Sequence, residues 1–264
     1  MKGEKMNSGT MMGRRGVVWK TPDITADGLK MFACITMLIQ SIGVIIVEKG
    51  LINLDQYTQE SLNQAMTEDS HLMLLAGVGS VMQLIGGMAV PIFAFLIVEG
   101  FRNTSDYKRY LLSVLLFALV SELPYDMAVN GKLWDFSGQN AMVSTFICLL
   151  MVYFLDMIKA QRGVAGVLFR FFIVFGGVIW AALFRAEFGL CMVLLTAVFY
   201  LFDTRNVLKT VLGVIISLLY VTGPLSFYGI WCYNGVRKDK LPKYAYYVFY
   251  PLHLLVLGIA VRLI

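Results

Sequence analysis

The stretch LMLLAGVGSVMQLIGGMAVPIFAFLIVEGF, residues 72–101, decides the fold class of this chain. About 17 to 25 apolar residues are enough to cross the hydrocarbon core of a bilayer as a helix, and this run is longer. The rest of the chain is similar, because 58% of the 264 residues are hydrophobic, 15% are charged and the mean hydropathy is +0.72. Soluble domains carry about a quarter charged residues. The composition therefore excludes a water-soluble globule and predicts an all-α, polytopic transmembrane bundle.

Nine apolar runs follow one another along the chain. They cover residues 28–47, 72–101, 110–129, 141–158, 165–184, 188–202, 207–222, 224–233 and 246–264. The sixth to eighth runs are short, and Gly223-Pro224 separates the seventh from the eighth. Because proline kinks or ends a helix, residues 207–233 form either a tight hairpin of two thin helices or one kinked helix. Residues 28–264 are predicted to form a single membrane domain.

Loop charge favours nine crossings with a cytoplasmic N-terminus. In that arrangement only Lys49, Lys132, Arg185 and Arg262 of the 22 Lys and Arg residues lie outside, which agrees with the positive-inside rule. Merging the seventh and eighth runs would move the basic loop 237–240 to the outer side. The long acidic outer segment, residues 48–71, is the expected lid or partner contact. Residues 1–27 are expected to be a partly disordered cytoplasmic tail without a cleavable signal peptide.

Several function classes find no support in the sequence. The four cysteines, Cys34, Cys148, Cys191 and Cys232, lie in separate apolar runs without metal-ligand spacing, so we interpret them as packing residues and expect neither zinc nor disulfides. The net charge of +5 follows from the inner loops and does not indicate nucleic-acid binding. No basic-aromatic nucleic-acid module is present.

Polar or glycine positions recur at one depth in four of the runs. At a rise of 1.5 Å per residue, Gln40-Ser41, Gly86-Gly87, Glu122 and His253 each fall roughly 15 to 20 Å from the inner face. Ionisable groups at that depth are costly and are functional candidates by default. The two ionisable residues also have structural alternatives. His253 could be a hydrogen-bonded packing residue between helices, and Glu122 could be a neutral, hydrogen-bonded carboxyl. The shared depth predicts a cavity near the bilayer midplane.

Five strings carry a resemblance to a known family. They are LKMFACITMLI (29–39), AVPIFAFLIVEGF (89–101), FALVSELPYD (117–126), YNG (233–235) and FYPLHL (249–254). Their order and spacing resemble the TraX family of bacterial integral membrane proteins from about residue 28 to the C-terminus. The resemblance implies a multi-pass protein of the bacterial inner membrane, related to membrane acyltransferases. It also implies N-terminal acetylation of conjugative pilin from acetyl-CoA or another acyl-CoA, without a metal.

The resemblance suggests acyl transfer inside a membrane cavity, with a histidine as base or acyl relay and a carboxylate that orients it. The expected catalytic residues are His253, Glu122 and Ser41. The expected substrate-binding residues are Gln40, Tyr125, Asp126, Asn140, Tyr233, Asn234 and Tyr250. Basic residues of the inner face are candidates for the phosphates of coenzyme A, above all Arg102, Lys108, Arg109 and Lys243, although topology alone explains their charge. The expected partners are membrane lipid and an exported peptide, pilin-like or glycan acceptor, without nucleic acid.

The chain departs from the family pattern at three places. Gln40-Ser41 replaces an Asp-His pair, Gly86-Gly87 replaces Gly-Arg, and Asn103 replaces a histidine. A Ser41 nucleophile with His253 as its base is one chemical rescue. A second hypothesis is a non-catalytic descendant that uses the cavity or segment 48–71 to bind a peptide, lipid or protein. A third is a small-molecule transporter with Glu122 as its proton-coupled site, although no inverted repeat is visible.

Overall fold

The computed structural model describes the whole chain except residues 1–10, 13–17, 20–22, 237–241 and 243. Most of the expected tail therefore lies outside the described residues. In the described part of this tail, β1 (Met11–Met12) and β2 (Val18–Trp19) pair antiparallel. From Ala26 onward the described regular structure is helical, as the apolar runs predict.

In the part of the chain that the structure describes, four helical segments are long and apolar enough to cross a membrane. The first is α1 (Ala26–Ile42), which continues into the π-helix η1 (Gly43–Ile52). The second joins α3 (Ser70–Gly87) to α4 (Ala89–Arg102), the third joins α5 (Tyr107–Tyr125) to η3 (Asp126–Asn130), and the fourth is α7 (Gly163–Leu183). Shorter apolar helices are α6 (Ala141–Met157), α8 (Gly189–Leu201), α9 (Asn206–Ser217) and α11 (Ala245–Val261).

Polar side chains mark where the long helices begin. Thr25 accepts a hydrogen bond from the amide of Gly28 at the start of α1, and Asp106 accepts one from the amide of Arg109 at the start of α5. The first amides of a helix have no partner inside it, so such caps stabilise the end, each by about 1 kcal/mol.

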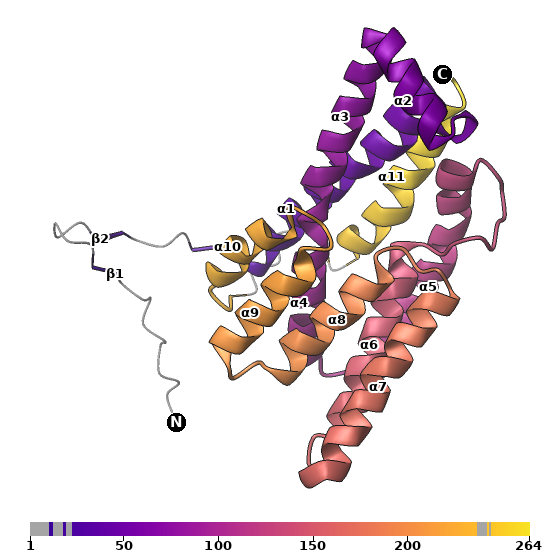
Figure 1. Cartoon of the computed structure of the whole chain (residues 1–264). Helices are drawn as coiled ribbons and strands as arrows, with labels where there is room; N and C mark the ends of the chain where they lie inside the picture. The colour runs from indigo at the N-terminus through magenta and orange to yellow at the C-terminus, as the bar shows by residue number, and fades with distance from the viewer. Residues whose placement is uncertain (1–10, 13–17, 20–22, 237–241, 243) are drawn as a thin grey trace.

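The helices pack as one bundle around α4 and α8. In Figure 1, α1 lies beside α3 and α11, and the latter packs on α5; α8 contacts α4, α6, α7 and α9. The side chains of Val193 and Leu195 on α8 are fully buried. On α7, by contrast, large apolar side chains such as Phe171, Phe172 and Trp180 are exposed. In a protein of this composition such a surface is the one that faces lipid.

Residues 206–231, after α8, form a helical hairpin. α9 has 12 residues, η4 (Gly223–Leu225) forms the turn, and α10 (Ser226–Trp231) has 6 residues. The indole of Trp231 donates a hydrogen bond to Thr210 Oγ1 over 3.1 Å and so ties the two helices together. Of the two alternatives left open by the Gly-Pro break, the structure has the hairpin.

This hairpin begins and ends at the same end of the bundle. Just before it, Asp203 pairs with Arg102 at the end of α4 over 2.6 Å. Just after it, the amide of Asn234 donates to the carbonyl of Ile24, beside the start of α1. At 1.5 Å per residue, α9 and α10 extend about 18 and 9 Å, less than the roughly 30 Å of a hydrocarbon core. The nine full crossings are therefore not confirmed, because these two helices are too short to be counted as crossings.

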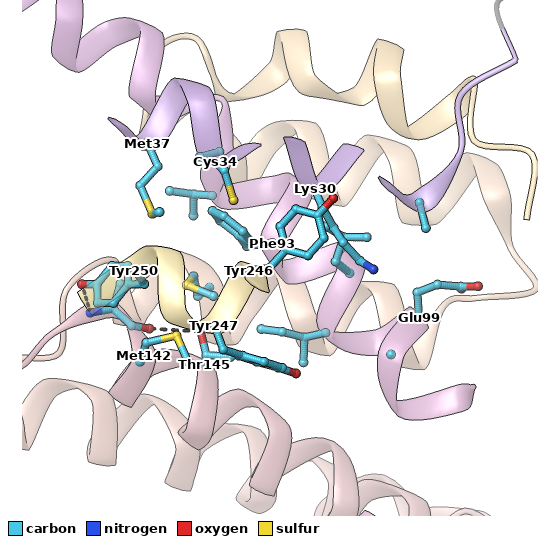
Figure 2. Close-up of a pocket in the computed structure, with 18 of the residues that line it drawn as sticks. Lys30, Cys34, Met37, Phe93, Glu99, Met142, Thr145, Tyr246, Tyr247 and Tyr250 are labelled. Carbon is cyan, nitrogen blue, oxygen red and sulfur yellow. Dashed lines mark hydrogen bonds between the residues drawn. The ribbon is translucent and has the colours of Figure 1, made fainter. Parts of the chain in front are cut away.

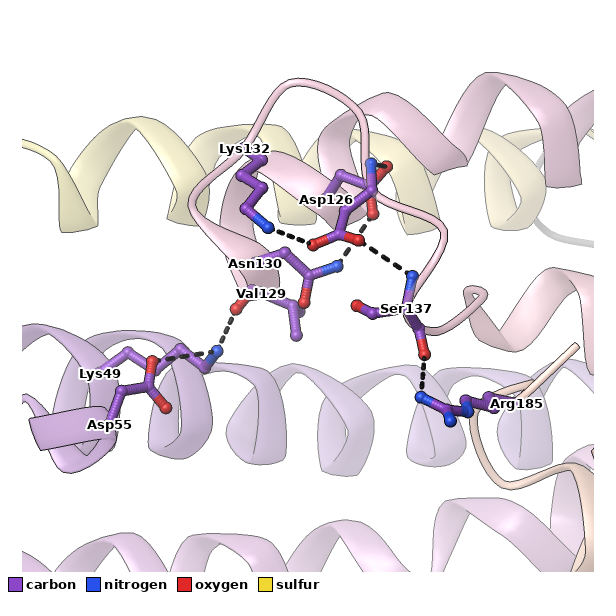
Figure 3. A network of polar contacts seen from close by, with 9 residues as sticks. Lys49, Asp55, Asp126, Val129, Asn130, Lys132, Ser137 and Arg185 are labelled. Atoms are coloured by element: carbon purple, nitrogen blue, oxygen red, sulfur yellow. Dashed lines mark hydrogen bonds and ion pairs between the residues drawn. The ribbon is translucent and has the colours of Figure 1, made fainter. Parts of the chain in front are cut away.

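A polar network occupies the opposite end of the bundle (Figure 3). Lys49 Nζ contacts the carbonyl of Val129 and lies 3.8 Å from Asp55, while Arg185 donates to the carbonyl of Ser137 over 3.4 Å. Lys49, Lys132 and Arg185 are three of the four basic residues expected on the outer side. The orientation of this end relative to the cytoplasm stays a prediction from loop charge.

Residues 48–71 fold at this same end and do not cover the cavity described below. The segment contains η2 (Leu54–Gln56) and α2 (Gln59–Glu68). Partly buried side chains such as Leu54, Met66 and Tyr57 pack on a small cluster of Val47, Ile52 and Leu72. The segment is thus attached to the ends of its own helices, and its role as a partner contact stays a prediction.

Candidate functional site

A cavity of about 380 Å³ opens between α1, α4, α6 and α11. Figure 2 shows Glu99 towards one end and Tyr250 at the other, with Phe93 and Tyr247 between them. The Glu99 end reaches the α4–α5 turn, since Asn103, Thr104 and Ser105 also line the cavity. At this end the carboxylate of Glu99 accepts hydrogen bonds from Asn103 over 2.9 Å and from the hydroxyl of Tyr233 over 3.1 Å.

Tyr250 forms part of the deep wall, and its hydroxyl lies between two partners. The amide of Ala141 donates to it over 3.0 Å, and the hydroxyl donates to Glu187 Oε2 over 3.4 Å. Tyr250 is buried on α11. The first amide of α6 and a carboxylate from the α7–α8 turn therefore both fix the position of this one phenol.

Glu187 is held by an unusual turn. The turn contains two non-glycine residues with left-handed backbone, Arg185 (φ 47°) and Phe188 (φ 58°), a conformation that costs energy and recurs at functional sites. The amide of Glu187 donates to Gln139 O over 2.8 Å, and Ser144 Oγ donates to the Glu187 carbonyl over 2.6 Å. Burial raises the pKa of the Glu187 carboxyl to about 7, against the lowering effect of the Tyr250 hydrogen bond.

A second buried carboxyl lies behind the same wall. Glu122 is 8% exposed and accepts a hydrogen bond from the side-chain amide of Asn140, which is fully buried. Asn140 also donates to the carbonyl of Ala118 over 2.9 Å and caps α6 by accepting from the amide of Met142 over 2.9 Å. Asn140 thus joins α5 to the first turn of α6, next to the amide that holds Tyr250.

Ser41 and His253 lie in hydrogen-bond contact. His253 is 6% exposed, its Nε2 lies 3.2 Å from Ser41 Oγ, and its Nδ1 lies 3.0 Å from the carbonyl of Phe249. Because a carbonyl only accepts, we assign the ring proton to Nδ1, which leaves Nε2 to accept from the serine. The same serine hydroxyl lies 3.0 Å from Met37 O. A hydrogen bond from the Ser41 hydroxyl to His253 Nε2 has the direction that a nucleophile and its base require. Neither residue lines the cavity.

The expected site residues therefore divide into groups. Gln40, Tyr233 and Tyr250 line the cavity, whereas Ser41, Glu122, Asn140 and His253 lie beside or behind its wall. The sequence predicted one chamber lined by Gln40-Ser41, Glu122 and His253. Of these residues only Gln40 lines the cavity. On α11, Tyr250 rather than His253 faces it. Tyr125 is buried outside the lining.

Other expected residues have local roles. Asp126 is fully buried, and its carboxylate accepts from Asn130 over 3.0 Å and from the amide of Asp135 over 2.8 Å, so it shapes the loop between η3 and α6. Asn234 Oδ1 accepts from the amide of Val236 in a turn. Lys108 and Arg109 are exposed at the start of α5 and line neither the cavity nor a second, separate cleft beside the α4–α5 turn.

Arg102 lines that separate cleft, and Lys243 lies outside the described residues. Among the residues that the structure describes, no group of three His, Cys, Asp or Glu could hold a metal ion.

Sequence reasoning missed Glu187. It lies in the short turn Phe184–Phe188 between the fifth and sixth apolar runs, where an acidic residue is unremarkable as a solvated loop position. The one available signal was the length of this turn, because a carboxylate between two apolar runs with so short a connection has little room to reach water.

Gly86 and Gly87 lie in close contact with neighbouring segments of the bundle. A side chain at Gly86 would overlap Gln40, with 2.8 Å to Gln40 Cδ, and one at Gly87 would lie 3.0 Å from both Thr222 Oγ1 and Tyr220 Cβ. The hydroxyl of Thr222 also donates to the carbonyl of Leu84. The tip of the α9–α10 hairpin therefore takes the space into which an arginine at Gly87 would extend.

Comparison with known proteins gives a consistent assignment. The family model described as TraX protein matches residues 25–261. The chain is 24% identical over 225 residues to the probable fimbrial assembly protein FimC, serogroup H1, of Dichelobacter nodosus, covering 73% of this chain and 89% of that protein. No solved structure matches.

Proposed function

The chain belongs to the TraX family, and from this premise we propose that it is a membrane-embedded acyltransferase. Its substrates are a cytosolic acyl thioester and the N-terminal amine or a hydroxyl of a membrane-borne or exported acceptor. The relative named for fimbrial assembly supports a pilin-like acceptor. The observation that carries the proposal is the cavity that leads from the α4–α5 turn to Tyr250, with Glu187 hydrogen-bonded behind it.

The deep end of the cavity provides the groups that acyl transfer needs. The acceptor amine or hydroxyl attacks the thioester carbonyl; a carbon–nitrogen or carbon–oxygen bond forms and the carbon–sulfur bond breaks. The proton lost by the acceptor passes to Tyr250 Oη as the phenol proton moves to Glu187 Oε2, and the return of a proton to the leaving thiolate restores both groups. Tyr250 is then the catalytic residue, and Glu187 positions it and holds the proton.

The Ser41–His253 pair is the other base in this region. If Ser41 served as an acyl relay, His253 Nε2 would take its proton, and Ser41 would turn from Met37 O toward the side of Gln40. Tyr250 is favoured because it contacts the cavity in the structure as it stands, whereas Ser41 has to change its side-chain rotamer first.

A comparison of two variants distinguishes these mechanisms. The assay follows labelled acetyl from acetyl-CoA to a pilin-like peptide with the purified protein in lipid nanodiscs. Tyr250→Phe is expected to lower the rate by about 100-fold or more, the usual contribution of a general base, while His253→Ala leaves more activity. Loss with His253→Ala together with full activity of Tyr250→Phe would instead support the serine relay.

A binding or assembly scaffold is the second candidate function. It is favoured by the replacement of the family's Asp-His and Arg positions by Gln40-Ser41 and Gly87, and by the hairpin tip packed at Gly87. A scaffold would hold a peptide in the cavity without consuming acyl-CoA. Saturable binding of the pilin-like peptide without any thiol release from acetyl-CoA would favour this function over transfer.

A further inference from the structure

A second cleft, of about 660 Å³, lies at the same end as the mouth of the cavity. Its walls come from the end of α4, the α4–α5 turn, the α6–α7 turn and the end of α8. Three cationic side chains line it: Arg102, Lys159 and Arg170. They come from three different helices or turns, so no local sequence pattern brings them together.

The cleft has an excess of positive charge. Arg102 pairs with Asp203 over 2.6 Å, and Lys159 pairs with Asp156 over 3.0 Å. Asp156 also accepts a hydrogen bond from Tyr200 over 2.8 Å. These two carboxylates therefore already have partners, and each is matched by a cation.

Arg170 supplies the excess. Its guanidinium donates to two main-chain carbonyls, Lys159 O over 3.4 Å and Gln161 O over 3.0 Å, which carry no formal charge. These bonds hold the side chain over the α6–α7 turn with its positive charge directed at the cleft. A guanidinium held in this way is suited to bind a phosphate group.

The cleft and the cavity share a wall. Thr104 and Ser105, in the turn between α4 and α5, line both of them. The cavity beyond this turn is mainly apolar and aromatic, with Phe93, Leu96 and Tyr247 in its wall. The two spaces are therefore neighbours, and a ligand that spans them would need a phosphate group in the cleft and a slender uncharged arm that passes over Thr104 and Ser105 into the cavity.

We propose that the cleft is a phosphate-binding site for such a ligand, with Arg170 and Lys159 as its main contacts and Thr104 and Ser105 as hydroxyl donors. The ligand is a phosphate ester whose uncharged arm enters the cavity. Two sources share this chemistry, a soluble nucleotide thioester and an anionic phospholipid. Only the nucleotide source rests on the proposed function, because it would be the acyl donor of that reaction.

Binding to the full-length protein in nanodiscs tests the proposal without any transfer step. The probes are coenzyme A and ADP, titrated calorimetrically in zwitterionic lipid, and phosphatidylglycerol, measured by its retention on the purified protein in native mass spectrometry. Arg170→Gln and Lys159→Gln are compared with Arg162→Gln, which neutralises an exposed arginine of the same turn that does not line the cleft.

Arg170→Gln and Lys159→Gln are expected to weaken binding of at least one probe by about tenfold or more, the usual effect of losing a hydrogen bond to a charged group, and Arg162→Gln less than twofold. Loss of nucleotide binding identifies the acyl donor, and loss of lipid retention alone identifies a phospholipid; both support the phosphate site. Lys159→Gln keeps the main-chain carbonyls to which Arg170 donates. A loss of binding in this variant therefore cannot be attributed to the loss of those contacts. Equal binding of every probe by all three variants and the wild type would overturn the proposal, as would the absence of any binding.

Discussion

Replacing Gly86 by alanine tests the contact between α1 and α3 at the depth of the cavity. A methyl group there would overlap Gln40, including Gln40 Cβ, which cannot move without its backbone. Overpacking of this kind costs about 1–3 kcal/mol, whereas a Gly→Ala change in a helix otherwise contributes up to about 1 kcal/mol of stability. We therefore expect Gly86→Ala to be destabilised, by up to about 2 kcal/mol after this offset.

The same helix offers a matched control. Gly77 also lies in α3, and a methyl group built on it meets nothing within 4 Å. The assay is thermal unfolding in detergent for Gly86→Ala, Gly77→Ala, Gln40→Ala and the double variant of Gly86 and Gln40. Gly77→Ala should match the wild type or exceed it, and Gln40→Ala should recover only part of the loss at Gly86, because alanine keeps the Cβ that the new methyl group overlaps. A melting temperature for Gly86→Ala at or above that of Gly77→Ala would refute the packing of Gln40 on this glycine.

Three further predictions concern the polar groups and the hairpin. Asn140→Ala should lower the free energy of unfolding by about 2 kcal/mol or more, because the α6 cap is lost and the Glu122 carboxyl loses its donor; an equal melting temperature would contradict this. Gly87→Arg should destabilise the protein more than Gly87→Ser, because the larger side chain has to displace Tyr220 and Thr222, and unfolding measurements on the two variants check it. The raised pKa of Glu187 stabilises the fold below the ordinary glutamate pKa of 4.5, and this contribution is lost as pH rises through about 7. Glu187→Gln should therefore lose less stability than the wild type between those pH values. Parallel pH profiles of the melting temperature for the two proteins would contradict this prediction.

Much of the fold could be predicted from local sequence because membrane helices are defined by length and apolarity. The run 141–158, for example, corresponds closely to α6 (Ala141–Met157). For residues 207–233 the Gly-Pro break allowed a hairpin or one kinked helix, and loop charge favoured the hairpin, which the structure has. The hydrogen bond from Trp231 to Thr210 joins its two helices. Helix lengths near a break are set by tertiary packing, so the short α10 was beyond sequence reasoning.

The sequence indicated one contact at the site but not which helix faces line the cavity. Equal depth suggested that Ser41 could meet His253, and the two side chains are in contact. Depth does not say which face of a helix a residue occupies, so the sequence could not show that Tyr250 lines the cavity and His253 does not. Glu187 and Arg170 depend on turns whose conformation is fixed only when neighbouring helices are in place.

The most direct test of the account is a transfer measurement on the wild-type protein and Glu187→Gln. The purified proteins in nanodiscs receive labelled acetyl-CoA and a pilin-like peptide with a free N-terminus, and acetylated peptide is followed across a range of pH, with Glu60→Gln on the exposed α2 as control. The account predicts transfer by the wild type and by Glu60→Gln, and for Glu187→Gln a large loss of kcat and of its pH dependence near 7. Unchanged kcat and pH profile in Glu187→Gln, or no transfer by a wild-type protein that binds the peptide, would contradict it.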